Sequence, residues 1–265
     1  MIFSNRDGRS PWQKESDSLK IKEKKFAEKR MNRQDSALNQ FLANKVPDKL
    51  QATLDSAFAK AFEMIFEKGT QVIEKTYKKD EMEKEHKVDL YANEIHQNRK
   101  SLNVFTQKSK KDGLVNLSVS GLAGVGMGLL GVGLPDIPVF TGMVLKSVYE
   151  TALRYGFEYE SDKERYFVLM IIEGAVSGGE HFSVVNRQID EFITLEELPE
   201  SYNTKTQIKA ASGVLSKELL YMKFLQGVPV VGAVGGAYDA IYMKQISEYA
   251  RIKYHKRFLL KMKES

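Results

Sequence analysis

Two aspartates in apolar, glycine-containing stretches are the residues of this chain whose type and setting come closest to catalytic chemistry. Asp136 stands within Leu-Pro-Asp-Ile-Pro, and Asp239 closes the run Gly-Gly-Ala-Tyr-Asp. Two carboxylates in apolar surroundings can hold different pKa values and share one proton, which is what hydrolysis by an aspartate pair requires. They are therefore the candidate catalytic residues, and a hydrolase that uses Asp136 with Asp239 is one hypothesis for function.

A structural role for the two aspartates is the interpretation that we favour. Their motifs echo those of intramembrane aspartyl proteases, but the order along the chain is reversed, and Pro135 stands where that family has a glycine. Buried acids are more often structural partners than catalysts. We expect Asp136 to cap a helix that starts at Pro138, and Asp239 to pair with a neighbouring lysine or hydroxyl. The sequence thus favours a non-catalytic protein over an enzyme.

The other motifs with chemical potential do not fit a cofactor or a metal ion. Gly126–Gly131 matches G-x-G-x-x-G, but no strand pattern precedes it, and Pro135 interrupts the helix that would have to hold a pyrophosphate. The chain has no cysteine and its four histidines are scattered, so we expect no metal site and no cofactor. Ser177 and His181 are close in sequence, but nearness does not make a catalytic triad, and we interpret their segment as a loop.

The C-terminal segment interleaves cations with aromatic residues. Residues 244–265 hold seven Lys/Arg and two Asp/Glu. A basic amphipathic helix can bind an anionic membrane surface, where each nearby cation contributes about 1 kcal/mol. A solvated helix face with a buried apolar side and a nucleic-acid-binding helix are the alternatives, and nucleic acid is the weaker one. The candidate membrane-surface residues are Arg251, Lys253, Lys256, Arg257 and Lys261.

Glycines recur at helical spacing in the two apolar stretches. Each glycine destabilises a helix by about 1 kcal/mol relative to alanine, so close packing of two backbones must offset that cost. We therefore predict two smooth helical faces that pack on one another or on a second copy of the chain. The candidate helix-packing residues are Gly121, Gly124, Gly128 and Gly131 in the first stretch and Gly232 and Gly236 in the second.

The first stretch also has the length of a membrane span. Leu114 to Leu134 is 21 residues without a charge, close to the roughly 20 that a bilayer core requires. Its polar residues and glycines offset most of the free energy that leucine and valine gain on insertion. Burial in a helical core is the favoured interpretation, with a true span and interfacial insertion as alternatives.

Helical periodicity dominates the rest of the chain, and no segment shows the alternation of a strand. The predicted fold class is an all-α multi-helix bundle with the two glycine-rich helices packed closely in its core. The expected helices begin after Pro47-Asp48, run over 144–155 to a C-cap at Gly156, follow a capping box at Ser161, and span 204–225 and 230–262.

Residues 1–35 differ from the remainder in composition. They hold ten Lys/Arg and six Asp/Glu and few branched apolar residues, so they cannot bury enough surface to offset the entropy of ordering. We predict a basic disordered tail over 1–35, with a partly helical stretch from Leu19 to Met31 as the alternative, and one helical domain over 36–265. The start of the chain shows no secretory signal, which favours the cytoplasm.

Four segments together resemble the EcsC family of bacterial proteins. They are Gly-Leu-Ala-Gly-Val-Gly at 121–126, Leu-Pro-Asp-Ile-Pro at 134–138, Arg-Tyr-Gly-Phe at 154–157 and Val-Pro-Val-Val-Gly-Ala-Val-Gly-Gly-Ala at 228–237. The resemblance covers about residues 45–260 and leaves the N-terminal tail outside. It implies a mainly helical, cytoplasmic or membrane-associated protein, linked to transport or secretion because the founding member is encoded beside an ABC transporter. It implies no known reaction, and Asp239 stands where many members have an amide.

The sequence therefore predicts a non-catalytic helical protein that associates with a membrane surface or with a partner. The expected partner is an anionic membrane surface or a membrane protein, and the glycine faces allow a homo-oligomer. The expected location is the cytoplasm, peripheral to the inner face of the cell membrane.

Overall fold

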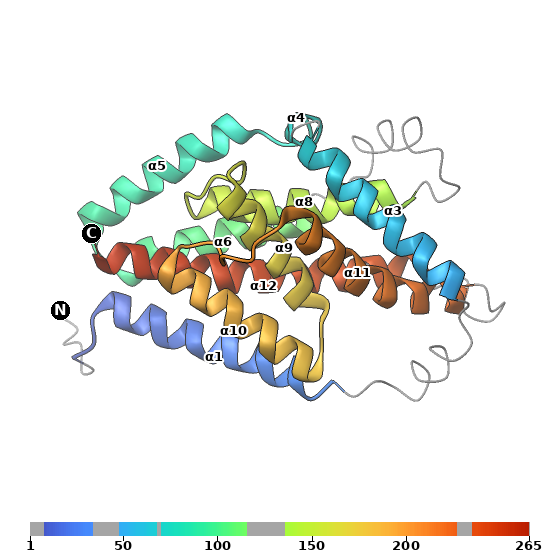
Figure 1. Cartoon of the computed structure of the whole chain (residues 1–265). Coiled ribbons are helices and arrows are strands. Elements are labelled where there is room, and N and C mark those ends of the chain that lie inside the picture. The colour runs from blue at the N-terminus through green and yellow to red at the C-terminus, as the bar shows by residue number, and fades with distance from the viewer. Residues whose placement is uncertain (1–7, 34–47, 68–69, 116–135, 227–234, 265) are drawn as a thin grey trace.

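A computed structural model describes residues 8–33, 48–67, 70–115, 136–226 and 235–264. These residues form an all-α multi-helix bundle without a strand, as the sequence predicted (Figure 1). The helices are α1 Pro11–Met31, α3 Asp48–Glu67, α4 Gln71–Glu74, α5 Lys79–His96, α6 Arg99–Val115, α8 Asp136–Arg154, α9 Asp162–Val176, α10 Gly179–Leu195, α11 Thr204–Gln226 and α12 Gly235–Glu264.

The predicted packing of the glycine faces lies outside the described residues. That holds for Gly121, Gly124, Gly128, Gly131 and Gly232. Gly236 is in the first turn of α12, but the description of that turn does not extend to its side-chain surroundings. Close packing and self-association through these glycines stay predictions.

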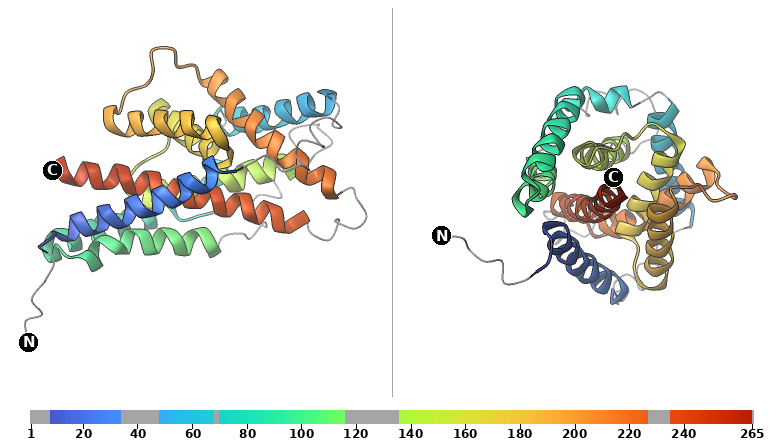
Figure 2. Two further views of the ribbon diagram at one scale, coloured as in Figure 1. Left: turned by 90° about the horizontal axis from the view of Figure 1, so that it is seen from below. Right: turned by 90° about the vertical axis from the view of Figure 1, so that its left-hand side faces the viewer.

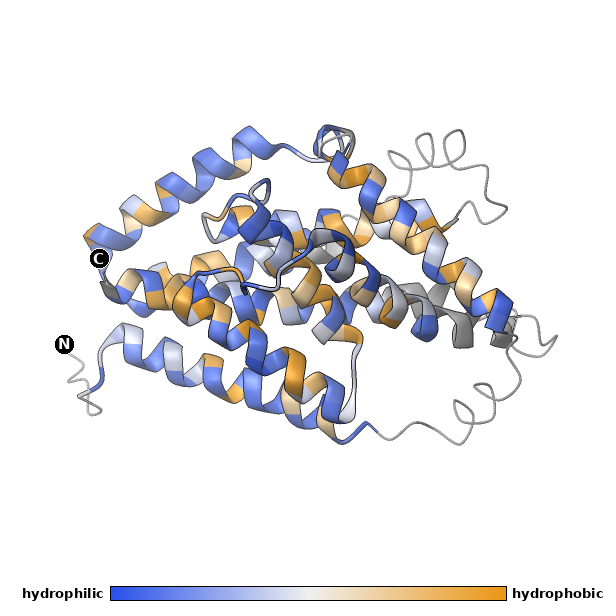
Figure 3. Cartoon of the chain, in the orientation of Figure 1, coloured by the Kyte–Doolittle hydropathy of each residue, from blue (hydrophilic) through white to orange (hydrophobic). Residues whose placement is uncertain are grey.

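Helices α9 and α12 form the centre of the bundle. Every residue of α9 from Tyr166 to Val176 is buried, which suits a helix that is covered on all sides. Figure 2 shows α12 near the middle of the bundle in its end-on view, and α12 contacts α1, α6, α8, α9, α10 and α11. The outer helices α1 and α5 are mainly hydrophilic (Figure 3).

The predicted junction between α8 and α9 is confirmed. Gly156 has φ +77°, and a Cβ there would lie 2.2 Å from His86 Nε2, so only glycine fits this C-cap. Ser161 caps α9 by accepting a hydrogen bond from the Glu164 backbone N–H at 3.3 Å. The interpretation of the Ser177–His181 segment as a loop is wrong for His181, because Gly179–Leu195 is one continuous helix.

The prediction of a disordered tail over residues 1–35 is wrong for residues 11–31. They form α1, which packs on α6, α10 and α12. Leu19 and Phe26 are buried, and Phe26 stacks on Tyr249 with 4.8 Å between ring centroids. Trp12 Nε1 donates a hydrogen bond to the backbone carbonyl of Leu259 at 2.9 Å. α1 is thus part of the bundle.

Candidate functional site: a basic seam between α1 and α6

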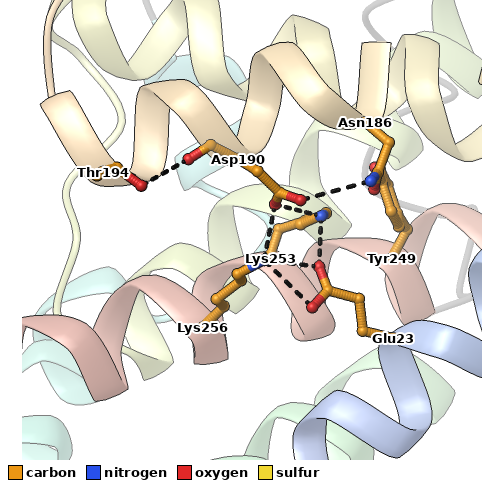
Figure 4. A network of polar contacts seen from close by, with 7 residues as sticks. All are labelled: Glu23, Asn186, Asp190, Thr194, Tyr249, Lys253 and Lys256. Atoms are coloured by element: carbon orange, nitrogen blue, oxygen red, sulfur yellow. Dashed lines mark hydrogen bonds and ion pairs between the residues drawn. The ribbon is translucent and has the colours of Figure 1, made fainter. Parts of the chain in front are cut away.

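The C-terminal cations, predicted to face a membrane, lie mostly inside the fold. Lys253 is fully buried, and its Nζ lies 2.6 Å from both Glu23 on α1 and Asp190 on α10. Lys256 Nζ lies 3.1 Å from Glu23 and 3.0 Å from Asp190 (Figure 4). Burial opposes the charge of Lys256, but the two carboxylates raise its pKa above the usual value. These two lysines fasten α12 to α1 and α10.

Arg257 also forms an ion pair in the interior of the bundle. Its Nη1 lies 2.7 Å from Glu164, and its Nε lies 2.9 Å from the more exposed Glu196. The guanidinium carbon is 4.3 Å from the centroid of Phe157, with two further phenyl rings within 6 Å, so the charge is partly held by cation–π contacts. Burial raises the pKa of Glu164, and Arg257 counteracts that rise.

The prediction of a membrane-facing surface on α12 is therefore wrong for Lys253, Lys256 and Arg257. Arg251 is half-buried, and burial lowers its pKa. Lys261 is exposed at the end of α12, with its Nζ 5.6 Å from the Phe157 ring centroid. Sequence reasoning missed this outcome because the partners of these cations lie far away along the chain.

The candidate catalytic aspartates are at helix starts. Asp136 is the first residue of α8, and Asp239 is in the second turn of α12. The surroundings of both side chains lie outside the described part of the structure, so the aspartate pair stays a prediction.

The serine and the histidine of the α9–α10 junction do not form a triad. Ser177 Oγ donates a hydrogen bond to the backbone carbonyl of Glu173 at 2.7 Å, so its partner is the last turn of α9 and not His181. His181 Nε2 lies 3.0 Å from Glu173 Oε1, and Gln207 donates to the other carboxylate oxygen at 3.0 Å. Burial raises the pKa of Glu173, and His181 counteracts the rise. This cluster joins α9, α10 and α11.

Within the described residues, no group of three or more His, Asp or Glu side chains is arranged to hold a metal ion. No helix in the same part of the chain combines the length and the apolar character of a membrane span.

An unneutralised basic surface lies on α1. Each of the four acids of α1 has an ion-pair partner: Glu15 with Arg99, Asp17 with Arg9 and Lys20, Glu23 with Lys253 and Lys256, and Glu28 with Lys24. Lys22, Lys25 and Lys29 take part in none of the ion pairs of the described residues. Their spacings of three and four place them on one flank of the helix.

The neighbouring helix α6 adds cations to the same flank. Arg99 and Lys110 are exposed, and together with Glu15 they are the charges that most affect the pKa of Lys22. Burial lowers that pKa, Glu15 raises it, and Lys110 and Arg99 lower it further, as expected where like charges converge. We call Lys22, Lys25, Lys29, Arg99 and Lys110 the basic seam.

Among the described residues, one carboxylate forms an ion pair with a cation of the seam. Glu15 is buried, and Arg99 Nε donates to its Oε2 at 3.3 Å. Glu15 Oε1 lies 3.9 Å from Nε2 of the buried His255 on α12. Burial, and then the charge of Lys22, lower the pKa of His255 to about 3, so its ring is neutral at physiological pH. Within the described residues, the five cations of the seam thus share one ion-paired carboxylate.

The EcsC protein family model matches residues 13–259, which is most of the chain. The chain belongs to the EcsC protein family. Protein EcsC of Bacillus subtilis (strain 168) is 24% identical over 222 residues, which cover 81% of each chain. No solved structure matches the chain.

The EcsC match corrects the extent of the resemblance seen in the sequence. That resemblance began near residue 45 and left the N-terminal segment outside, whereas the family match begins at residue 13. α1 and α6, which carry the basic seam, both lie almost entirely within the EcsC match. The family itself assigns no reaction to these residues.

Proposed function

We propose that this EcsC family protein binds the anionic inner surface of the cell membrane through the basic seam and that it catalyses no reaction. The observation that carries the proposal is the gathering of five cations on two adjacent helices, where the described residues supply one ion-paired carboxylate, Glu15. At Lys22, Glu15 is the acid among the described residues that offsets the repulsion from Arg99 and Lys110, and an anionic surface would offset that repulsion further.

The size of the expected attraction follows from the number of cations. Each Lys or Arg near an anionic leaflet contributes about 1 kcal/mol, so the five cations contribute up to about 5 kcal/mol. That free energy corresponds to an increase of roughly a thousandfold or more in partitioning at low salt. The attraction weakens steeply with salt because exposed charges are screened.

This mode of binding agrees with a peripheral protein of the cytoplasm, linked to transport or secretion at the membrane. An acidic patch on a membrane protein would satisfy the same cations and is the alternative partner. The nucleic-acid alternative rested on the basic termini, and it loses support because Lys253, Lys256 and Arg257 are used inside the fold.

Sedimentation with lipid vesicles tests the proposal. We expect the chain to bind vesicles that contain phosphatidylglycerol and not vesicles of phosphatidylcholine alone. Replacing Lys22, Lys25, Lys29 and Lys110 together by glutamine should weaken binding by at least about a hundredfold, at about 1 kcal/mol per cation. None of the four takes part in the ion pairs that the described residues form, so the fold should persist.

The matched control removes four lysines from another face. Lys60 on α3 and Lys205, Lys209 and Lys217 on α11 are exposed and take no part in the ion pairs of the described residues. Their replacement by glutamine removes the same net charge and should change binding much less. Equal losses in the two variants would show that net charge, and not the seam, drives binding.

A further inference from the structure

We propose that an apolar stripe on α5 enters the interfacial region of the same membrane that the basic seam contacts. The stripe consists of Val88, Tyr91 and Ile95, which are 66%, 65% and 60% exposed. Their spacings of three and four place them on one face of the helix. The proposal rests on the proposed function, because it assigns the depth and orientation of the bound protein.

The stripe stands apart from the other exposed apolar residues. On the other described helices, two large exposed apolar residues are never less than ten positions apart; Ile21 and Met31 on α1 are an example. Single exposed apolar residues are normal on protein surfaces, whereas three adjacent ones on a mainly hydrophilic helix indicate an interaction surface (Figure 3).

The polar neighbours of the stripe suit a lipid interface. Lys84 and Lys87 are exposed and lie one turn before Val88 and Tyr91. Long lysine side chains can keep their ammonium groups at the headgroups while apolar neighbours are buried more deeply. The tyrosine ring is apolar with a polar tip, which is the reason tyrosine is enriched at membrane interfaces. The exposed Glu94 lies three residues after Tyr91, at the edge of the stripe.

The stripe and the basic seam belong to one layer of the molecule. α5 packs on α6 through Lys108, whose Nζ lies 3.3 Å from Glu85 and 2.7 Å from Asp89. α6 packs in turn on α1 (Figure 2). α6, which packs on both α5 and α1, adds two further exposed lysines, Lys100 and Lys111. A flat anionic surface can therefore contact α5, α6 and α1 together.

A lipid surface fits the stripe better than a protein partner does. Stable protein interfaces bury about 800 Å² on each partner around a central apolar cluster, and three side chains along a single helix fall short of that. The cations beside the stripe are complementary to anionic headgroups. They would repel a second copy of this chain that brought the same layer.

Site-specific labelling tests the proposal directly, because the chain has no cysteine. A polarity-sensitive fluorophore is attached to Val88→Cys or Ile95→Cys, and to Lys209→Cys on α11 as the control. We expect phosphatidylglycerol vesicles to shift the emission of the two α5 labels to shorter wavelength and to leave the control label unchanged. The triple variant Val88→Ser, Tyr91→Ser and Ile95→Ser should bind at low salt, but at least tenfold more weakly than the original chain at about 1 M salt, where the Debye length is about 3 Å.

Each other outcome overturns the proposal in a recognisable way. Vesicle binding with the α5 labels still in water would refute insertion of the stripe and leave the seam proposal standing. A shift of the α5 labels without vesicles that grows with protein concentration would assign the stripe to self-association. Failure of the original chain to bind vesicles would refute the proposed function and the stripe proposal together.

Discussion

Replacing Lys253 by methionine should destabilise the protein far more than the same change at Lys256. The two lysines contact the same two carboxylates, Glu23 and Asp190, but the Lys253 side chain is 0% exposed and that of Lys256 is 29% exposed. The comparison therefore isolates the effect of burial on one ion-pair network.

The structure sets the expected magnitudes. Removing one partner of a buried ion pair typically costs about 3–5 kcal/mol. Glu23 and Asp190 are 18% and 31% exposed and keep Lys256, so we expect the lower end, about 3 kcal/mol, for Lys253→Met. Lys256→Met removes a charge on a side chain that is 29% exposed and should cost about 0–1 kcal/mol.

Urea denaturation followed by far-ultraviolet circular dichroism measures both free energies of unfolding. The helical content of the bundle gives the signal, and the difference between the two variants should be about 2–3 kcal/mol. Equal losses for Lys253→Met and Lys256→Met, or no loss for either, would refute the account of Lys253 as a buried anchor of α12.

Three further changes test other contacts. Gly156→Ala should lower the free energy of unfolding by at least about 2 kcal/mol, because it places a Cβ against His86 and keeps the residue at positive φ. Adding His86→Ala removes the collision and should recover only part of the lost stability. Full recovery would contradict the argument that the backbone conformation itself disfavours alanine. Phe26→Ala should lower the free energy of unfolding in urea by about 3–5 kcal/mol, because it leaves a cavity where the ring packs between α1 and α12. A loss below about 1 kcal/mol would contradict the packing of α1 on the bundle. Arg154 lowers the pKa of Glu85, so this carboxylate stabilises the fold above its unfolded pKa and loses that contribution as pH falls through the lowered value; Glu85→Gln should reduce the acid sensitivity of the melting temperature, and an unchanged pH profile would argue against the pair.

Local signals in the sequence predicted much of the bundle. Gly156 and Ser161 marked the junction of α8 and α9 because a C-cap and an N-cap depend on residues within one turn. The regular apolar spacing after Pro47-Asp48 and after Thr204 likewise predicted α3 and α11.

The sequence suggested at most a partial helix from Leu19 to Met31, and the full length and the packing of α1 were missed because its buried face is not apolar throughout. Its fully buried residues are Leu19 and Phe26 together with Glu15 and Arg30. Charged residues at half of the buried positions remove the periodic apolar signal on which sequence reasoning depends. The partners that make such burial favourable come from other helices, such as Arg99 for Glu15.

The burial of the C-terminal cations could not be predicted from nearby residues either, because their partners also come from other helices. Lys253 pairs with residues 230 and 63 positions away, Glu23 and Asp190. A basic amphipathic pattern looks alike whether its cations face a membrane or buried carboxylates, and only the fold decides between them. The basic seam became visible only after the acids of α1 were assigned to their partners.

Chemical acetylation of lysines, with and without phosphatidylglycerol vesicles, tests the central claim most directly. Mass spectrometry of the modified chain reports the reactivity of each lysine. We predict that vesicles protect Lys22, Lys25, Lys29 and Lys110, that the exposed lysines of α11 react equally in both samples, and that the buried Lys253 stays unreactive. Protection that is uniform over the surface, or strongest on α11, would contradict binding through the basic seam.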